Sequence, residues 1–326
     1  MYRFDINSKN EGQFTSGKFA QQRAKWKINN YGWNSPIDYY RKKEIGKTRI
    51  AIIGDSFVEA FQVDVEKSYP SQLRAELGND YEVYSFGISG APLSQYLHIS
   101  RYVNRTFNPE ILIFNVVHND FAESISQLNP EDVNWLAIDV KNGVPKESLP
   151  RPDYSFSQYN FKKRILKKSA LFRYIYQNLK IYDYIKYVLQ EKEEKKYNAN
   201  VDINMLKKNE TTIVIGIKFI LNQIRLENPE QRVIVIIDAP RRDIYANKSD
   251  VYIAFWHRIL GKYCLENKFE VIDLTQSMKK DYESNHIKFN SEPDFHWNEY
   301  GHRFVSTQIL EQLKIPEFLV QAGNGP

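Results

Sequence analysis

The sequence predicts an α/β fold of the flavodoxin-like, doubly wound kind, with about five parallel strands and helices on both faces. Short apolar runs typical of buried parallel strands alternate with segments of helical periodicity, and this alternation predicts the parallel sheet. The runs that predict strands are 49–53, 82–86, 111–117, 232–238 and 269–273. The segments that predict helices are 68–77, 93–107, 211–227, 251–266 and 299–313.

Two segments depart from this alternation. Residues 1–48 are polar with scattered aromatic side chains, which predicts an N-terminal arm or irregular cap outside the core. Residues 49–315 form the predicted main domain, and residues 316–326 a C-terminal tail. Within the main domain, residues 121–205 separate the third and fourth strands by more than a normal crossover. The near-helical spacing of apolar residues in 161–196 predicts a helical insertion that packs on the core, with a lid or a membrane- or polysaccharide-facing surface as the alternative.

Composition excludes several classes of protein. A formal charge of +5, from 45 basic and 40 acidic residues, is too small to indicate a nucleic-acid partner. The single cysteine, Cys264, excludes an internal disulfide and a cysteine-based metal cluster. No apolar run is long enough to span a bilayer, and no signal segment opens the chain. The sequence also lacks G-x-G-x-x-G after the first strand and a P-loop, so no nucleotide cofactor is predicted.

Chemically useful residues follow the predicted strands. Because the carboxyl ends of parallel strands meet at one edge of the sheet, residues that follow them are expected to lie together. The four sites are Gly54-Asp55-Ser56-Phe57, Gly87-Ile88-Ser89-Gly90, His118-Asn119-Asp120 and Asp294-Phe295-His296-Trp297. A hydroxyl, backbone next to glycine, an amide and an Asp/His pair are the groups that acyl transfer needs.

Each group has a predicted task in that chemistry. Ser56 is the candidate nucleophile, and His296 is the base that takes its proton. Asp294 is expected to orient the imidazole and stabilise its protonated form. The predicted oxyanion donors are the backbone N–H groups of Ser56 and Gly90 and the side-chain amide of Asn119. This chemistry requires no cofactor and no metal ion.

In their order, these motifs resemble the SGNH (GDSL-type) hydrolase superfamily. The resemblance covers roughly residues 49–313 apart from the insertion, and it implies that residues 49–315 are a catalytic domain. The matching blocks are Gly54-Asp55-Ser56, the oxyanion glycine Gly90, Val117-His118-Asn119-Asp120 for Gly-x-Asn-Asp, and Asp294 with His296 before the last helix.

Two departures from the family pattern affect the prediction. Val117 stands where the family usually has glycine, and His118 adds a titratable group near the site. The last block is Asp-x-His instead of Asp-x-x-His and is followed by Trp297, which is similar to the branch containing alginate-type polysaccharide O-acetyltransferases. Asp55, His118 and Trp297 are predicted as further residues lining the site, with Asp55 stabilising the turn and a merely buried His118 as the alternative.

The same residues also have structural interpretations. Ser56 alone is compatible with a helix N-cap, and His296 with a structural histidine, but the other blocks outweigh both. Asp294 and His296 as metal ligands lack a third ligand at helical spacing. Ser89 in Gly87-Ile88-Ser89-Gly90-Ala91 nearly matches the G-x-S-x-G elbow, and it ranks behind Ser56 as nucleophile because the Asp and His lie only two residues apart.

The predicted function is a serine-dependent ester hydrolase that removes short acyl groups, acetyl first, from a carbohydrate or related small molecule. An O-acetyltransferase acting on a cell-envelope or secreted polysaccharide is the alternative, and a non-catalytic glycan-binding protein is a third. The expected partner is an acylated small molecule or glycan, and no oligomeric state is predicted. The resemblance and the polar arm suit a bacterial envelope protein held near a membrane by an anchor outside this sequence.

Overall fold

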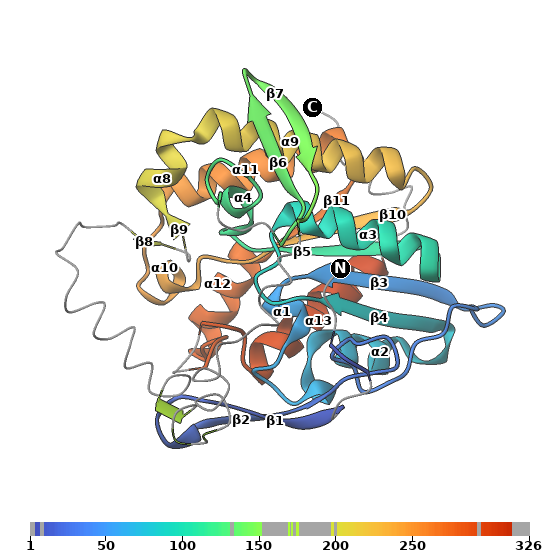
Figure 1. The fold of residues 1–326 in the computed structure, drawn as a ribbon. Helices are drawn as coiled ribbons and strands as arrows, with labels where there is room; N and C mark the ends of the chain where they lie inside the picture. The colour runs from blue at the N-terminus through green and yellow to red at the C-terminus, as the bar shows by residue number, and fades with distance from the viewer. Residues whose placement is uncertain are drawn as a thin grey trace.

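A central parallel sheet organises the molecule. The computed structural model describes residues 4–6, 10–130, 134–151, 197–198, 201–291 and 295–314, and positions 169, 171, 174 and 175. The sheet has five strands in the spatial order β11-β10-β5-β3-β4, all paired in parallel (Figure 1). They are β3 (Thr48–Gly54), β4 (Tyr81–Gly87), β5 (Ile111–Val116), β10 (Arg232–Ile237) and β11 (Glu270–Asp273). Numbered along the chain, this order is 2-1-3-4-5, and the predicted doubly wound fold is confirmed.

The register of the sheet brings the ends of its strands to one edge. Gly54, at the end of β3, lies opposite Gly87 in β4 and Asn115 in β5. Ile237, at the end of β10, lies opposite Val116 in β5 and Asp273 in β11. The segments that follow the strands therefore start from the same edge, where ligands of open α/β sheets bind.

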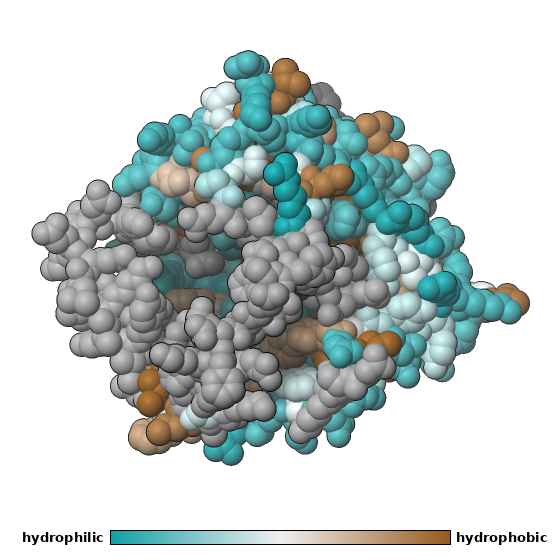
Figure 2. Space-filling view, viewed as in Figure 1, coloured by the Kyte–Doolittle hydropathy of each residue, from teal (hydrophilic) through white to brown (hydrophobic). Residues whose placement is uncertain are grey.

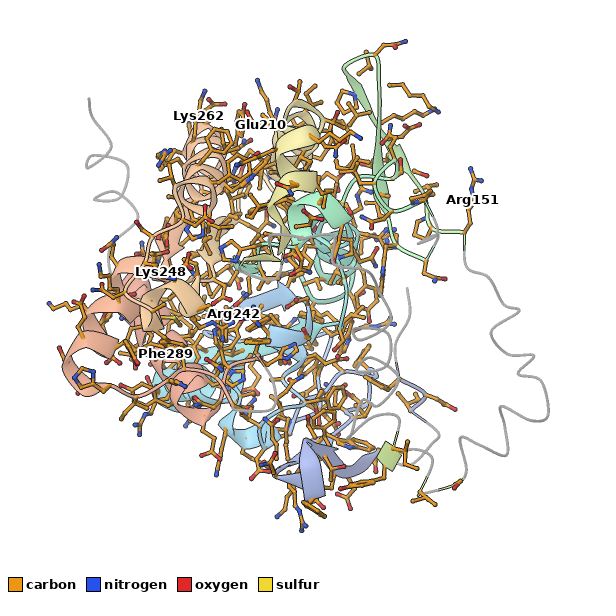
Figure 3. All side chains as sticks on the ribbon, turned by 90° about the vertical axis from the view of Figure 1, so that its left-hand side faces the viewer. Arg151, Glu210, Arg242, Lys248, Lys262 and Phe289 are labelled. Atoms are coloured by element: carbon orange, nitrogen blue, oxygen red, sulfur yellow. The ribbon has the colours of Figure 1, made fainter. Side chains whose placement is uncertain are left out.

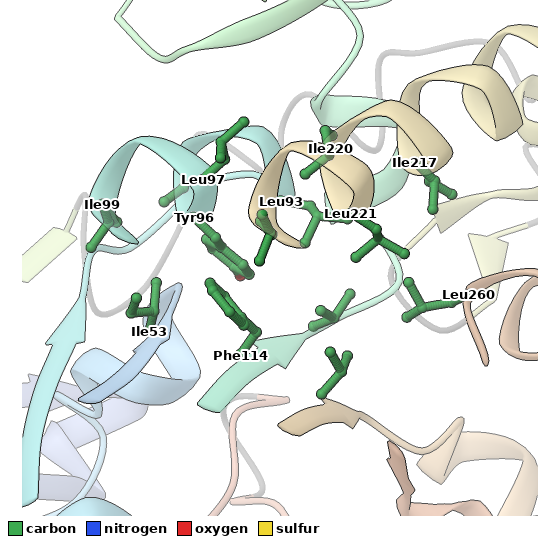
Figure 4. Close-up of a cluster of buried hydrophobic side chains, with 14 of the residues drawn as sticks. Ile53, Leu93, Tyr96, Leu97, Ile99, Phe114, Ile217, Ile220, Leu221 and Leu260 are labelled. Atoms are coloured by element: carbon green, nitrogen blue, oxygen red, sulfur yellow. The ribbon is translucent and has the colours of Figure 1, made fainter. Parts of the chain in front are cut away.

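Helices cover both faces of the sheet. The first face packs on α3 (Leu93–Phe107), α9 (Glu210–Glu227) and α11 (Val251–Glu266), and its core includes Phe114 of β5 with Leu93 and Tyr96 of α3 (Figure 4). The second face packs on α2 (Tyr69–Leu77), α12 (Leu274–Asn285) and α13 (Glu299–Leu313). Along β3, alternate residues enter different cores, because successive side chains of a strand point to opposite faces.

Helix boundaries follow the sequence closely. The predicted segments 93–107, 251–266 and 299–313 coincide with α3, α11 and α13. Helix α12 was not predicted, although Asp273 caps it by accepting a hydrogen bond from the Thr275 N–H at 2.9 Å. The shorter elements are α1 (Ser56–Glu59), α4 (Asp120–Glu123), α8 (Ile203–Lys208), α10 (Arg241–Tyr245), β8 (Tyr197–Asn198), β9 (Val201–Asp202), and the 3-10 turns Lys18–Ala20, Val65–Lys67 and Gly78–Asp80.

The N-terminal segment is part of the core, and the prediction of an arm outside it is wrong. Strands β1 (Glu11–Ser16) and β2 (Gln22–Lys27) form an antiparallel hairpin. Beyond it, Trp33 and Tyr39 are almost fully buried, and the Tyr39 hydroxyl donates to the Ser85 carbonyl of β4 at 3.0 Å. These aromatic residues follow no strand or helix periodicity, so their burial depends on docking against the sheet and not on a local pattern.

The sequence predicts a helical insertion between β5 and β10, but the described part of this segment is not wholly helical. Strands β6 (Ala137–Lys141) and β7 (Val144–Ser148) form an antiparallel hairpin that projects from the molecule (Figure 1). Its two-residue turn, Asn142-Gly143, has positive φ at both positions, which is the geometry that Asn-Gly favours. Figure 2 shows a mostly hydrophilic described surface around this hairpin and α9. Most of residues 161–196, and the predicted tail 316–326, lie outside the described residues.

Candidate functional site

Ser56 lies at the sheet edge, where β3 turns into α1. Asp55 caps this helix by accepting a hydrogen bond from the Phe57 N–H at 2.9 Å, so Ser56 is its first residue. The Ile88 N–H donates to the Gly54 carbonyl at 3.1 Å, which joins the turn after β4 to the turn after β3. The first two sequence blocks are therefore adjacent in the structure.

The contact between Ser56 and His296 is the central feature of this edge. The Oγ of Ser56 and the Nε2 of His296 are 2.7 Å apart, although 240 residues separate them in the sequence. Both side chains are half-buried, and the Phe57 ring packs at 4.9 Å from the imidazole. A hydroxyl and an imidazole nitrogen at this distance can exchange a proton, which is the step that activates a serine. Asp294, the predicted third member, lies outside the described residues.

Gly90 and Asn119, which carry predicted oxyanion donors, follow β4 and β5 at the edge of the sheet where β3 ends. The Ala91 N–H donates to the Ile88 carbonyl at 3.0 Å, and Gly90 within this turn has a φ of +77°, which a residue with a side chain adopts only under strain. Gly90 is exposed, and nothing lies within 4 Å of where a Cβ would stand. Asn119 follows β5, half-buried, and its amide donates to the Glu123 carboxylate at 2.8 Å.

Asp120 fixes the loop that carries Asn119. Its Oδ2 accepts hydrogen bonds from the Val117 N–H at 2.9 Å and from the Tyr96 hydroxyl at 2.8 Å. Burial holds the pKa of Asp120 well above its usual range. Val117 is absent from the residues with positive φ, so this loop does not require the glycine that the resemblance implies.

His118 lies in a buried chain of hydrogen bonds. Its Nε2 is 2.7 Å from the Nε2 of His257 in α11, and the Nδ1 of His257 is 2.7 Å from Asp273 at the end of β11. Burial, together with His257 and Arg241, holds the pKa of His118 well below its usual range. His118 is 4% exposed, so in this structure it is a buried histidine that ties the third-block loop to α11.

Trp297 and Arg241 secure the backbone on both sides of His296. The indole N–H of the fully buried Trp297 donates to Asp238 at 3.1 Å. Arg241 forms an ion pair with the same carboxylate at 2.9 Å and donates to the Phe295 carbonyl at 2.7 Å. The neighbouring Arg242, which is labelled in Figure 3, covers the exposed Phe295 ring, with the guanidinium carbon 3.9 Å from the ring centroid.

Sequence reasoning missed Asp238 and Arg241. A signal for them exists, because Asp238-Ala239-Pro240-Arg241 follows the fourth strand at the same sheet edge as the other blocks. His257 and Glu59 were missed as well. Both lie inside helices, where no local pattern marks them.

The buried carboxyl group of Asp55 makes the stability of the protein depend on pH. Burial raises the pKa of Asp55 to about 7, so between about pH 4 and pH 7 the folded protein keeps a proton that the unfolded chain releases. The contribution of this group to the free energy of unfolding therefore falls as pH rises through that window. Replacing Asp55 by Asn keeps a cap and removes the titration, so Asp55→Asn should be more stable than wild type at pH 8, by on the order of 2 kcal/mol.

Urea unfolding of both proteins at pH 5 and pH 8 measures this difference. The stabilisation should shrink at pH 5, where wild-type Asp55 is already protonated. Asp202→Asn, at the half-buried N-cap of α8, is the matched control for exchanging a capping carboxylate for an amide. An equal effect of Asp55→Asn at both pH values would contradict the prediction.

Among the described residues, no group of three or more His, Cys, Asp or Glu side chains is placed to hold a metal ion. None of the described helices combines the length and apolar character needed to cross a membrane.

Comparison with known proteins identifies the family. The model of the GDSL-like Lipase/Acylhydrolase family matches residues 52–304, which include Ser56, Gly90, Asn119 and His296. The chain belongs to this family. No curated protein matches the chain.

Several solved structures are similar to this GDSL-like acylhydrolase at low sequence identity. One is a member of the lipolytic protein G-D-S-L family from Veillonella parvula DSM 2008, with 13% identity, a TM-score of 0.41, and coverage of 81% of this chain and 97% of that chain. The acetyl xylan esterase AlAXEase is 14% identical, with a TM-score of 0.46 and coverage of 81% and 99%. A lipase/acylhydrolase from Enterococcus faecalis is 13% identical, with a TM-score of 0.43 and coverage of 82% and 95%.

Proposed function

We propose that this GDSL-like acylhydrolase is a serine esterase that removes short acyl groups, acetyl first, from a carbohydrate or related small molecule through an acyl-enzyme on Ser56. The observation that carries the proposal is the 2.7 Å contact between the Ser56 Oγ and the His296 Nε2 at the carboxyl edge of the sheet. Family membership supports acylhydrolase chemistry in general.

The proposed reaction has two halves. In the first, Oγ forms a bond to the acyl carbon while Nε2 of His296 takes its proton, and the tetrahedral oxyanion is bound by the N–H groups of Ser56 and Gly90 and by the Asn119 amide. The intermediate then collapses, and the alcohol leaves with the proton from His296. In the second half, a water molecule gives a proton to His296 and attacks the acyl carbon of the ester on Ser56. The bond from Oγ to the acyl carbon then breaks, Oγ takes the proton back from His296, and the acid is released.

In this proposal Asp294 orients His296, as the resemblance implies. The network of Trp297, Asp238 and Arg241 also stabilises the loop that carries His296, because it fixes the residues on both sides of His296. A base that is already fixed in place avoids the entropic loss of ordering it during the reaction.

Transfer of the acetyl group to a sugar hydroxyl is the second candidate. Trp297 directly after His296 favours it, because that sequence is similar to the polysaccharide O-acetyltransferase branch. The two functions share the acyl-enzyme and differ only in whether water or a hydroxyl of a glycan attacks it.

Intact-mass spectrometry after incubation with p-nitrophenyl acetate tests both candidates. We expect an adduct of one acetyl group on Ser56 that decays at the same rate with and without added oligosaccharides, releasing acetate. Faster decay with oligosaccharide, together with acetylated sugar as product, would establish transfer. No adduct and no turnover, with retained glycan affinity in Ser56→Ala, would favour the non-catalytic function.

A further inference from the structure

A buried carboxyl group lies beneath the turn that carries Gly90. Glu59 is the last residue of α1, the helix that begins with Ser56, and it is only 5% exposed. Its Oε2 accepts a hydrogen bond from the Ser89 backbone N–H at 3.0 Å and a second one from the Ser89 hydroxyl. The proposed chemistry gives Glu59 no task, although burying a carboxyl group is unfavourable unless its bonds compensate.

The backbone of Glu59 is held in place independently of its side chain. Its carbonyl accepts a hydrogen bond from the Asn34 amide at 2.6 Å. A Cβ built on Gly87 would lie 2.1 Å from the Glu59 nitrogen and 2.6 Å from its Cα, so the end of β4 contacts the end of α1 directly. The backbone that carries the Glu59 carboxylate is therefore fixed next to the Ser89 turn.

The bonds to Ser89 constrain the peptide that follows it. Ser89 and Gly90 are the central residues of the turn from Ile88 to Ala91, and the N–H of Gly90 belongs to the peptide between them. Anchoring both the N–H and the hydroxyl of Ser89 fixes its backbone and side-chain rotation. Gly90 by itself has unusually free backbone rotation, so its N–H needs such an anchor to keep one direction.

We propose that Glu59 is a positioning residue that links the helix of the nucleophile to the Ser89–Gly90 peptide and thereby orients the Gly90 N–H toward the oxyanion. This inference rests on the proposed serine-esterase function. Through Glu59, the Ser56 N–H and the Gly90 N–H keep a constant separation, which is what preorganised stabilisation of a tetrahedral oxyanion requires.

Opposing effects act on the pKa of the Glu59 carboxyl group. Burial raises the pKa of Glu59 to about 7, while the hydrogen bonds from Ser89 lower it. Of the titratable groups facing it, Asp55 raises the pKa and His296 lowers it. The Ser89 bonds are thus the main local interactions that favour the ionised carboxylate, which accepts both of them.

The test compares Glu59→Gln and Glu59→Ala with Glu76→Gln, an exposed glutamate on α2. With an aryl acetate as substrate, kcat should fall about 10-fold in Glu59→Gln and about 10²-fold in Glu59→Ala, because one oxyanion donor is worth about 10²–10³ in rate. KM should change less than about 3-fold, since the ground-state ester makes little use of that donor.

Phenylboronic acid provides a second readout. It forms a tetrahedral adduct on a serine Oγ, so its affinity should fall in parallel with kcat, whereas a purely structural role of Glu59 would leave the boronate affinity of the folded variant unchanged. Glu59→Gln is nearly isosteric and decides the question if Glu59→Ala does not fold.

The outcomes separate this inference from the proposed function. Variants of Glu59 with the kcat and boronate affinity of Glu76→Gln would overturn the inference alone, because wild type would still be active. A wild-type protein that neither hydrolyses aryl acetates nor binds the boronate would overturn the proposed function and the inference with it.

Discussion

Replacing Ser56 by Ala is expected to lower kcat/KM for an aryl acetate by about 10⁶, the magnitude found when a nucleophilic serine is removed from a hydrolase. The physical reason is that no acyl-enzyme can form, and only the oxyanion donors and substrate binding remain to accelerate attack by water. His296→Ala should have a similar effect, because the Oγ then loses the group that lies 2.7 Å away to take its proton. The double variant should be little worse than either single one, since the two residues act as a unit.

Steady-state kinetics together with labelling by a fluorophosphonate provide the measurement. Wild type should gain one label, mapped to Ser56, and Ser56→Ala should gain none. Ser89→Ala is the informative comparison, because Ser89 is the rival nucleophile of the sequence and its hydroxyl is bound to Glu59. A label that maps to Ser89, or activity that survives Ser56→Ala and not Ser89→Ala, would overturn the assignment of the nucleophile.

The sequence predicted what depends on local patterns and on topology. Strands such as 111–117 were predictable because a parallel strand buried on both faces is a continuous apolar run, and all six residues of β5 are buried. The common edge at which β3, β4 and β5 end, before the turns that carry Ser56, Gly90 and Asn119, was predictable because topology alone brings strand ends together. The 2.7 Å contact of His296 with Ser56 joins the first and the last of the four motif blocks, which lie near opposite ends of the domain sequence.

Other features depend on tertiary contacts that no local pattern encodes. Trp33 and Tyr39 are buried because a polar segment docks on β4. The spacing of the aromatic residues in that segment matches neither a strand nor a helix, so it did not predict their burial. Glu59 in a four-residue helix and His257 in α11 gain their partners only after distant turns are brought beside them. By contrast, the β6–β7 hairpin has a local signal in Asn142-Gly143, which the predicted helical insertion, based on apolar spacing in 161–196, did not take into account.

Arg49→Met is expected to lower the free energy of unfolding by about 3–5 kcal/mol, the typical result of breaking a buried ion pair by removing one partner. Arg49 is fully buried at the amino end of β3 and donates from Nε to Glu82 of β4 at 2.6 Å. Its Nη1 also donates to the carbonyl oxygens of Arg41 and Phe107. Methionine fills much of the volume and supplies no charge, so Glu82, itself 9% exposed, keeps a buried carboxylate without its main partner.

Urea unfolding measures the loss, and Arg101→Met is the matched control. Arg101 bonds to Glu147 and Glu227 with about a quarter of its side chain exposed, so its removal should lower stability by about 1 kcal/mol or less. Adding Glu82→Leu to Arg49→Met should recover much of the loss, because no uncompensated charge then remains buried. A loss no larger than that of Arg101→Met would contradict the prediction. Because Arg49 lies at the edge of the sheet opposite Ser56, the activity of the folded fraction should stay at the wild-type level, which separates the stability of this fold from the chemistry at its other edge.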